Sequence, residues 1–298
     1  MFRKILATMI VLALALVPMM AMAEGANYTI GFAVSTLENP FFVTMKDAAV
    51  AKAAELGVEL MVLDAQDSAE TQASQIEDFI VRGVDLLIIN PVDSDAIGTS
   101  VVACNNEGIP VITVTRASNA GQVVQHLDID NREAGRLDAE QLIIDLGGKG
   151  KVAVLEGIAG SSSAIERNEG FVAALEGTEI EIVASLTANY AREEGASVTE
   201  DILQANPELD AIYAHNDEMA LGAVRSVAAA GRSAEIKIYG IDATDDALVT
   251  VENGEMAATV QQQPDLQIET ALENAVAFLG GAELEALVCI PLKLIVKG

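Results

Sequence analysis

Short apolar runs alternate with longer segments of helical periodicity along nearly the whole sequence, and this alternation is the feature that most limits how the chain can fold. In the first half it predicts helices over 40–56, 68–82 and 94–107, each followed closely by a glycine. The strands predicted before and between them cover 28–34, 59–64, 86–89 and 110–114. A strand–helix rhythm of this kind indicates a parallel sheet with helices on both faces.

The same rhythm starts again after a short predicted strand over 123–127. Helices are expected over 132–146, 193–205 and 218–230, and the later strands over 151–155, 181–186, 211–214, 237–239 and 257–260. We therefore predict two similar α/β units in series, each a mostly parallel sheet covered by helices. Ligands bind such sheets beyond the carboxyl ends of the strands, so two units that face each other would form a cleft.

The first residues have the layout of a secretory signal peptide. Arg3 and Lys4 precede an apolar segment over 5–20, and the small residues Ala21 and Ala23 give a cleavage site. We predict cleavage after Ala23 and export, most simply to a bacterial periplasm. The alternative is an N-terminal membrane anchor, but the apolar segment is shorter than the ~20 residues that a spanning helix needs.

The formal net charge is −28 at pH 7. Nucleic-acid binding depends on cationic contacts with phosphate, so we predict no nucleic-acid partner for a chain this acidic. We interpret the charge as an aid to solubility. The Gly/Ser loop over 157–161 lacks the Gly-Lys-Ser/Thr ending of a phosphate-binding loop, so no nucleotide cofactor is expected.

Few residues suit a metal site. The two histidines, His126 and His215, are far apart in the chain, and the acidic residues near Asp242 lack the spacing of a calcium loop. We expect no metal and no cofactor. The two cysteines, Cys104 and Cys289, leave two alternatives open: a disulfide, which export would permit, or two buried free thiols.

Polar and aromatic side chains follow the predicted strands, at the points where each strand ends. After the first strand come Ser35, Asn39, Phe41 and Phe42, with Pro40 suited to the first position of a helix. Planar amide, guanidinium and carboxylate groups can bond two neighbouring hydroxyls, and aromatic rings can cover the C–H faces of a sugar. The sequence therefore predicts a sugar site. Polar and aromatic groups at other strand ends are Thr115, Arg116, Arg167, Asn189, Tyr190, Asn216, Asp217, Asp242, Gln261, Gln262 and Gln263.

Five segments closely resemble the bacterial periplasmic ribose-binding proteins, and the resemblance extends from Tyr28 over essentially the rest of the chain. The segments are 35–42 (STLENPFF), 89–96 (INPVDSDA), 157–161 (GIAGS), 166–171 (ERNEGF) and 216–223 (NDEMALGA). The resemblance implies the type I periplasmic binding protein fold, in which two Rossmann-like lobes are joined by a hinge that the chain crosses three times.

The resemblance also implies where the lobes begin and end. By analogy the crossings fall near 129–130, 262–263 and 291–292. After the signal peptide at 1–23, the N-terminal lobe would comprise 24–129 and 263–291. The C-terminal lobe would comprise 130–262 and 292–298.

Family binding positions match this chain in kind at most of the strand ends. The resemblance implies that the rings of Phe41, Phe42 and Tyr190 sandwich the sugar, while polar groups bond its hydroxyls. Two positions depart from the family: Thr115 stands where ribose binders carry Asp, and Tyr190 where they carry Phe. The expected ligand is therefore another pentose, a hexulose or a polyol, or a ligand with negative charge, and D-ribose stays open. The matching positions are Ser35, Asn39, Phe41, Phe42, Arg116, Arg167, Asn216, Asp242 and Gln262.

The function that the resemblance implies is a monomeric, non-enzymatic receptor that delivers a sugar or polyol to the membrane permease of an ABC importer. A second role with a chemotaxis receptor stays open. Two other functional classes fit the sequence less well. A transcriptional regulator with the same core needs a DNA-binding motif where the signal peptide lies. An exported glycosidase would use Asp242 with Asp217 or Glu218, but the sequence offers no carboxylate pair at a set separation.

Overall fold

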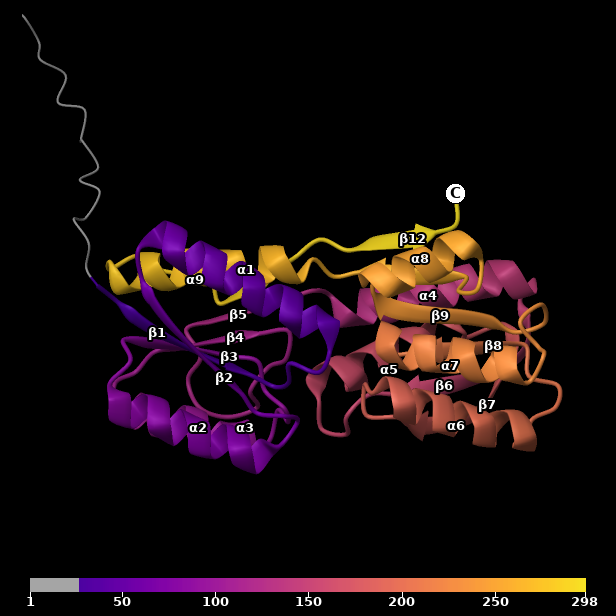
Figure 1. Ribbon diagram of the computed structural model, residues 1–298, viewed down its shortest axis with the longest axis horizontal. Helices are drawn as coiled ribbons and strands as arrows, with labels where there is room; N and C mark the ends of the chain where they lie inside the picture. The colour runs from indigo at the N-terminus through magenta and orange to yellow at the C-terminus, as the bar shows by residue number, and fades with distance from the viewer. Residues whose placement is uncertain (1–26) are drawn as a thin grey trace, which may run out of the picture.

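The computed structural model describes residues 27–298. Two α/β lobes lie one beyond the other along the long axis of the molecule (Figure 1). Each lobe has a six-stranded sheet covered by helices on both faces, as the alternating pattern predicts. The predicted signal peptide at 1–23 lies outside the described residues, so cleavage after Ala23 stays a prediction.

In the first lobe the strand order is β11-β5-β4-β3-β1-β2, and every pair of neighbours is parallel. Helices α1 (Pro40–Leu56) and α9 (Pro264–Leu279) pack on one face, and α2 (Ala69–Arg82) and α3 (Ile97–Asn106) on the other (Figure 1). The strands are β1 (Thr29–Val34), β2 (Glu59–Asp64), β3 (Leu86–Ile89), β4 (Val111–Val114), β5 (Gln125–Asp128) and β11 (Leu287–Cys289).

In the second lobe the strand order is β12-β10-β9-β8-β6-β7, with the pair β10–β12 antiparallel and the others parallel. The strands are β6 (Lys149–Glu156), β7 (Glu179–Thr187), β8 (Ala211–Ala214), β9 (Lys237–Asp242), β10 (Ala258–Gln261) and β12 (Lys293–Val296). One face carries α4 (Asn131–Leu146) and α5 (Ser162–Ala174). The other carries α6 (Arg192–Ala205), α7 (Asp217–Ala229) and α8 (Asp245–Asn253).

The chain passes between the two sheets three times: between β5 and α4, between β10 and α9, and between β11 and β12 (Figure 1). The exact lobe limits given by the resemblance stay a prediction. Within residues 27–298, no helix has the length and apolar character needed to cross a membrane.

Two element boundaries differ by three residues from the sequence prediction, and the other predicted boundaries lie within two residues of the observed ones. Helix α3 begins at Ile97 rather than Ser94, because the Asp93 carboxylate accepts the N–H groups of Asp95 and Ala96 in a turn. Strand β9 continues past Tyr239 to Asp242 and pairs with β10 along this length. Glycine and aspartate are poor strand formers, which is why the sequence pattern ends the strand too early.

Candidate ligand-binding site

A small cavity of about 20 Å³ lies between the lobes, at the carboxyl ends of strands from both sheets. Every predicted site residue except Ser35 lines it, and Ser163 is an addition that sequence reasoning missed. Its lining comprises Asn39, Phe41, Phe42, Thr115 and Arg116 from the first lobe, Ser163, Arg167, Tyr190, Asn216 and Asp242 from the second, and Gln262 where the chain passes between them.

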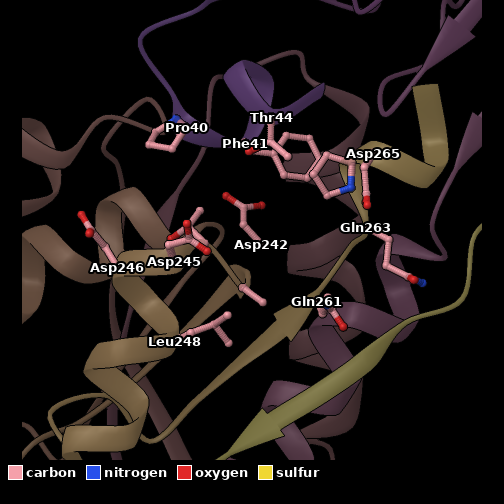
Figure 2. A pocket seen from close by; sticks show the side chains of 13 residues that line it. Pro40, Phe41, Thr44, Asp242, Asp245, Asp246, Leu248, Gln261, Gln263 and Asp265 are labelled. Carbon is pink, nitrogen blue, oxygen red and sulfur yellow. The ribbon is translucent and has the colours of Figure 1, made fainter. Parts of the chain in front are cut away.

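Two wider grooves adjoin the cavity. A groove of about 310 Å³ shares Phe41 and Asp242 with it. Figure 2 shows this groove, with the Asp242 side chain between the first turn of α1 and the start of α8. The second groove, of about 320 Å³, shares Phe42, Arg116 and Tyr190 with the cavity. The cavity therefore lies between two openings to solvent.

The end of β1 positions the two phenylalanines. Asn39 caps α1, because its Oδ1 accepts the backbone N–H of Phe41 at 2.9 Å. The Phe41 and Phe42 rings meet edge to face, with centroids 5.1 Å apart. Ser35 is buried, but it does not line the cavity, and within the described chain its Oγ has no hydrogen-bond partner. Its predicted ligand contact has no support from the cavity lining.

The Arg116 guanidinium lies between two aromatic rings. Its carbon is 5.6 Å from the centroid of Phe42 and 5.1 Å from that of Tyr190, which is cation–π geometry. Its Nη1 donates to the Pro91 carbonyl at 2.9 Å. Burial lowers the pKa of Arg116 from its ordinary value. The resemblance implied a sugar between these rings, whereas the structure has a guanidinium there.

Thr115 has a left-handed backbone, with φ +59°. Its hydroxyl donates to the Val114 carbonyl at 2.6 Å and accepts from the Asn90 side chain. The hydroxyl is therefore used within its own lobe. It does not replace the two-oxygen acceptor that an Asp would offer at this position.

Tyr190 brings a hydroxyl to the cavity wall. Its OH lies 3.0 Å from Ser163 Oγ, which in turn lies 2.8 Å from Ser161 Oγ. The Tyr190 ring packs on Gly157, where an added Cβ would approach Tyr190 Cζ to 2.0 Å. The serine run after β6 was the available signal for Ser163, because it follows a strand end.

Arg167, on α5, is held by two neighbouring elements. Its Nε donates to Asn131 Oδ1 at 2.9 Å, and its Nη1 donates to the His215 carbonyl at 2.5 Å. Burial, with a smaller contribution from Arg167, lowers the pKa of His215 to about 3, so this histidine is neutral. Asn216 caps α7 by accepting from Met219 N at 3.0 Å.

Among residues 27–298, Asp242 is the only carboxylate that lines the cavity. Gln262 Nε2 donates to its Oδ1, while within the described chain its Oδ2 has no partner. Burial first, and then the charge of Asp217, raise the pKa of Asp242 well above its ordinary value. Asp242 can therefore accept from a ligand hydroxyl when ionised and donate when protonated.

The carboxylates considered for a glycosidase pair do not join Asp242 in the cavity. Asp217 accepts from Thr259 Oγ1 at 2.7 Å and from Thr244 N at 2.8 Å. Glu218 forms a two-point ion pair with Arg192, at 2.6 and 2.9 Å. Within residues 27–298, no group of three or more His, Cys, Asp and Glu side chains is arranged to hold a metal ion.

Two α/β lobes around a buried, polar and aromatic cavity define a periplasmic solute-binding protein, and the comparisons with known proteins agree. The family model described as "Periplasmic binding protein domain" matches residues 30–283, so the chain belongs to this family. The chain is 44% identical over 273 residues to the ribose import binding protein RbsB of Haemophilus influenzae, covering 92% of this chain and 93% of that protein. It is 41% identical over 272 residues to RbsB of Escherichia coli K12, covering 91% and 92%.

Solved structures give the same fold with several ligands. The Caulobacter myo-inositol binding protein bound to myo-inositol superposes with a TM-score of 0.87 at 35% identity, covering 92% of this chain and 94% of that chain. An ABC transporter solute-binding protein of Actinobacillus succinogenes with bound D-allose gives 0.86 at 32% identity, covering 91% and 98%. Proteins of this fold therefore bind different polyhydroxylated solutes.

Proposed function

We propose that this protein is a receptor of an ABC importer that binds a monosaccharide, or a related sugar derivative or polyol, between its lobes. The observation that supports this most is the cavity in which flat polar groups and aromatic rings from both lobes meet. Hydrogen bonds to charged groups contribute roughly 1.5–3 kcal/mol each, so a few of them suffice for tight binding of a small solute.

Binding would work by closure. A solute that touches both lobes stabilises the closed state, because only that state offers both sets of contacts. Hydrogen bonds within the chain also join the two lobes directly. Ser162 N donates to Ser94 Oγ at 3.2 Å, and Ser94 N donates to the Gly160 carbonyl at 3.2 Å. Ala117 N donates to Ser162 Oγ at 3.0 Å. The closed surface would then be what a permease recognises.

The proposed function also includes a location and the partners of the protein. We propose export to the periplasm with cleavage after Ala23, action as a monomer, and delivery of an unchanged solute to the permease. A chemotaxis receptor that recognises the same closed surface is a second proposed partner.

The test uses exported protein freed of bound solute by unfolding and refolding. Calorimetric titration with a panel of monosaccharides, sugar acids and polyols should reveal one tight ligand. Small-angle X-ray scattering should show compaction with that ligand, and mass spectrometry should recover it unchanged. Absence of binding across the panel, or conversion of the bound sugar, would contradict the proposal.

A further inference from the structure

Two buried guanidinium groups face the cavity without an ion-pair partner. Arg116 and Arg167 are each only 4% exposed. Among the described residues, no carboxylate oxygen lies within 4.0 Å of either guanidinium. Their hydrogen bonds go to neutral oxygens of Pro91, Asn131 and His215. Unpaired buried charge is costly, so two such groups at one cavity favour an anionic occupant.

Nearby carboxyl groups compensate these charges only in part. Asp67 lines the outer groove near Arg116, Asp138 is buried within range of Arg167, and Asp242 is bonded to Gln262. Burial raises the pKa of all three carboxyls, and none of the three forms an ion pair with either guanidinium. Neither Asp67 nor Asp138 lines the cavity, so neither can contact a ligand inside it.

The hydrogen-bond donors and acceptors that line the cavity also favour an anionic ligand. Each guanidinium has N–H groups beyond those used by protein oxygens. The Oδ1 atoms of Asn39 and Asn216 cap helices, and Asn216 Nδ2 donates one N–H to the Tyr190 carbonyl at 3.2 Å. The Asn39 amide N–H groups and the second Asn216 amide N–H are left for a ligand. The Thr115 hydroxyl is occupied within its lobe. The cavity is therefore rich in donors and poor in acceptors.

The remaining acceptors are few. They are the second oxygen of Asp242, the Gln262 carbonyl oxygen and the hydroxyls of Tyr190 and Ser163. A neutral sugar donates one proton from every hydroxyl and needs an acceptor for each. A carboxylate in place of the aldehyde group adds acceptors without adding a donor, and a carboxylate in place of a hydroxymethyl group also removes a donor. Both kinds of sugar acid suit this lining better than the neutral sugar.

We propose that the preferred solute is a sugar acid, whose carboxylate binds Arg116 and Arg167 while its hydroxyls reach Asp242 and the Tyr190–Ser163 pair. This rests on the proposed function, since it names the class of solute for the same cavity. A planar carboxylate matches the fork of a guanidinium, and hydrogen bonds with both partners charged are about twice as strong as neutral ones. At about 20 Å³ the cavity has room for about one water in this structure, so binding a sugar unit requires the lobes or the lining side chains to move apart.

The first test compares ligands matched in carbon skeleton. Calorimetric titrations of the exported, refolded protein would use D-ribose, ribitol, D-ribonate and D-ribose 5-phosphate, and then D-galactose with D-galacturonate. We expect a sugar acid to bind at least about tenfold more tightly than its neutral partner, which is 1.4 kcal/mol. Tighter binding of the neutral sugar would overturn the inference alone, and tighter binding of the phosphate would overturn its carboxylate assignment. If no sugar of either kind binds, the proposed function fails.

The second test restores the missing carboxylate. Thr115→Asp adds a negative charge beside Arg116, and Asp tolerates a left-handed backbone better than Thr does. We expect the ratio of acid affinity to neutral affinity to fall by about tenfold or more. Thr115→Asn introduces the same shape without the charge, so its ratio measures the effect of shape. Equal ratios in the two variants would overturn the inference, and thermal unfolding of both checks that they fold.

Discussion

The Tyr190 ring lies directly against the backbone of Gly157, so closely that a Cβ on Gly157 would come within 2.0 Å of Tyr190 Cζ. The same ring covers the Arg116 guanidinium, with 5.1 Å between that carbon and the ring centroid. A glycine in the loop after β6 therefore sets the depth of the aromatic wall. The wall, in turn, holds one of the two cationic groups of the cavity.

Gly157→Ala should displace this wall. The added methyl group has no room, and overpacking of a dense interior costs about 1–3 kcal/mol. We expect a lower unfolding temperature and ligand affinity reduced by about tenfold or more, measured by thermal unfolding and calorimetry. Gly280→Ala is the matched control, because its φ is −77° and its nearest neighbours lie 3.3 Å or more from an added Cβ. Equal effects from both variants would contradict this role for Gly157.

The fold could be predicted because its signals are local. The run Leu86-Leu87-Ile88-Ile89 reads as a buried strand and is fully buried, since helices cover both faces of the sheet. Helix ends were equally clear: Gly57 and Gly83 have the left-handed φ that closes a helix. The start of α3 was mispredicted because a side chain decides it, at the Asp93 turn, and the end of β9 because Gly240 and Asp242 are poor strand formers.

The sequence predicted most of the residues that line the cavity, but not the hydrogen bonds and ring contacts between them. Strand ends give the residues that can reach the cavity, because parallel strands deliver their carboxyl ends to one edge. The sequence cannot show that the Asn90 side chain, at the end of the neighbouring strand, donates a hydrogen bond to the Thr115 hydroxyl. Nor can it show that the Arg116 guanidinium enters the space between Phe42 and Tyr190. Both depend on contacts between residues that are distant in the chain.

Closure should depend on the hydroxyl of Ser94. Its Oγ accepts from the N–H of Ser162 in the opposite lobe at 3.2 Å. Ser94→Ala removes one bond, worth about 0.5–1.5 kcal/mol, from the closed state only, so affinity should fall by about 2- to 13-fold. Scattering should show a more open ligand-free protein. In the control Ser118→Ala, the lost bond runs to Ala120 within one lobe, and affinity should stay at the wild-type value.

Acid should destabilise the protein through His215. Burial lowers its folded-state pKa from 6.5 to about 3, whereas the unfolded chain takes up a proton below its ordinary pKa. This contribution to stability is complete above pH 6.5 and is lost as the pH falls toward 3. In this range one proton changes the free energy of unfolding by about 1.4 kcal/mol per pH unit.

The comparison with His215→Gln isolates this effect, because the buried carboxyl groups titrate in both proteins. Urea unfolding across the acid range should give a wild-type stability that declines more steeply on acidification, by about 1.4 kcal/mol per pH unit. The quantity compared is the slope of the free energy of unfolding against pH, so a loss of stability that is the same at every pH does not affect the comparison. Parallel slopes would show that the histidine accepts a proton in the folded state.

The two cysteines should react very differently with a thiol reagent. The sequence left a disulfide or two buried thiols open, but the structure has both thiols free, with Cys104 buried and Cys289 exposed. Burial raises the pKa of Cys104 to about 11, and the thiolate is the reactive form. At about pH 8 one thiol should react in the folded protein and the second only after unfolding. Cys289→Ala should abolish the first reaction and Cys104→Ala should keep it, whereas a failure of both thiols to react after unfolding without reductant would reveal a disulfide.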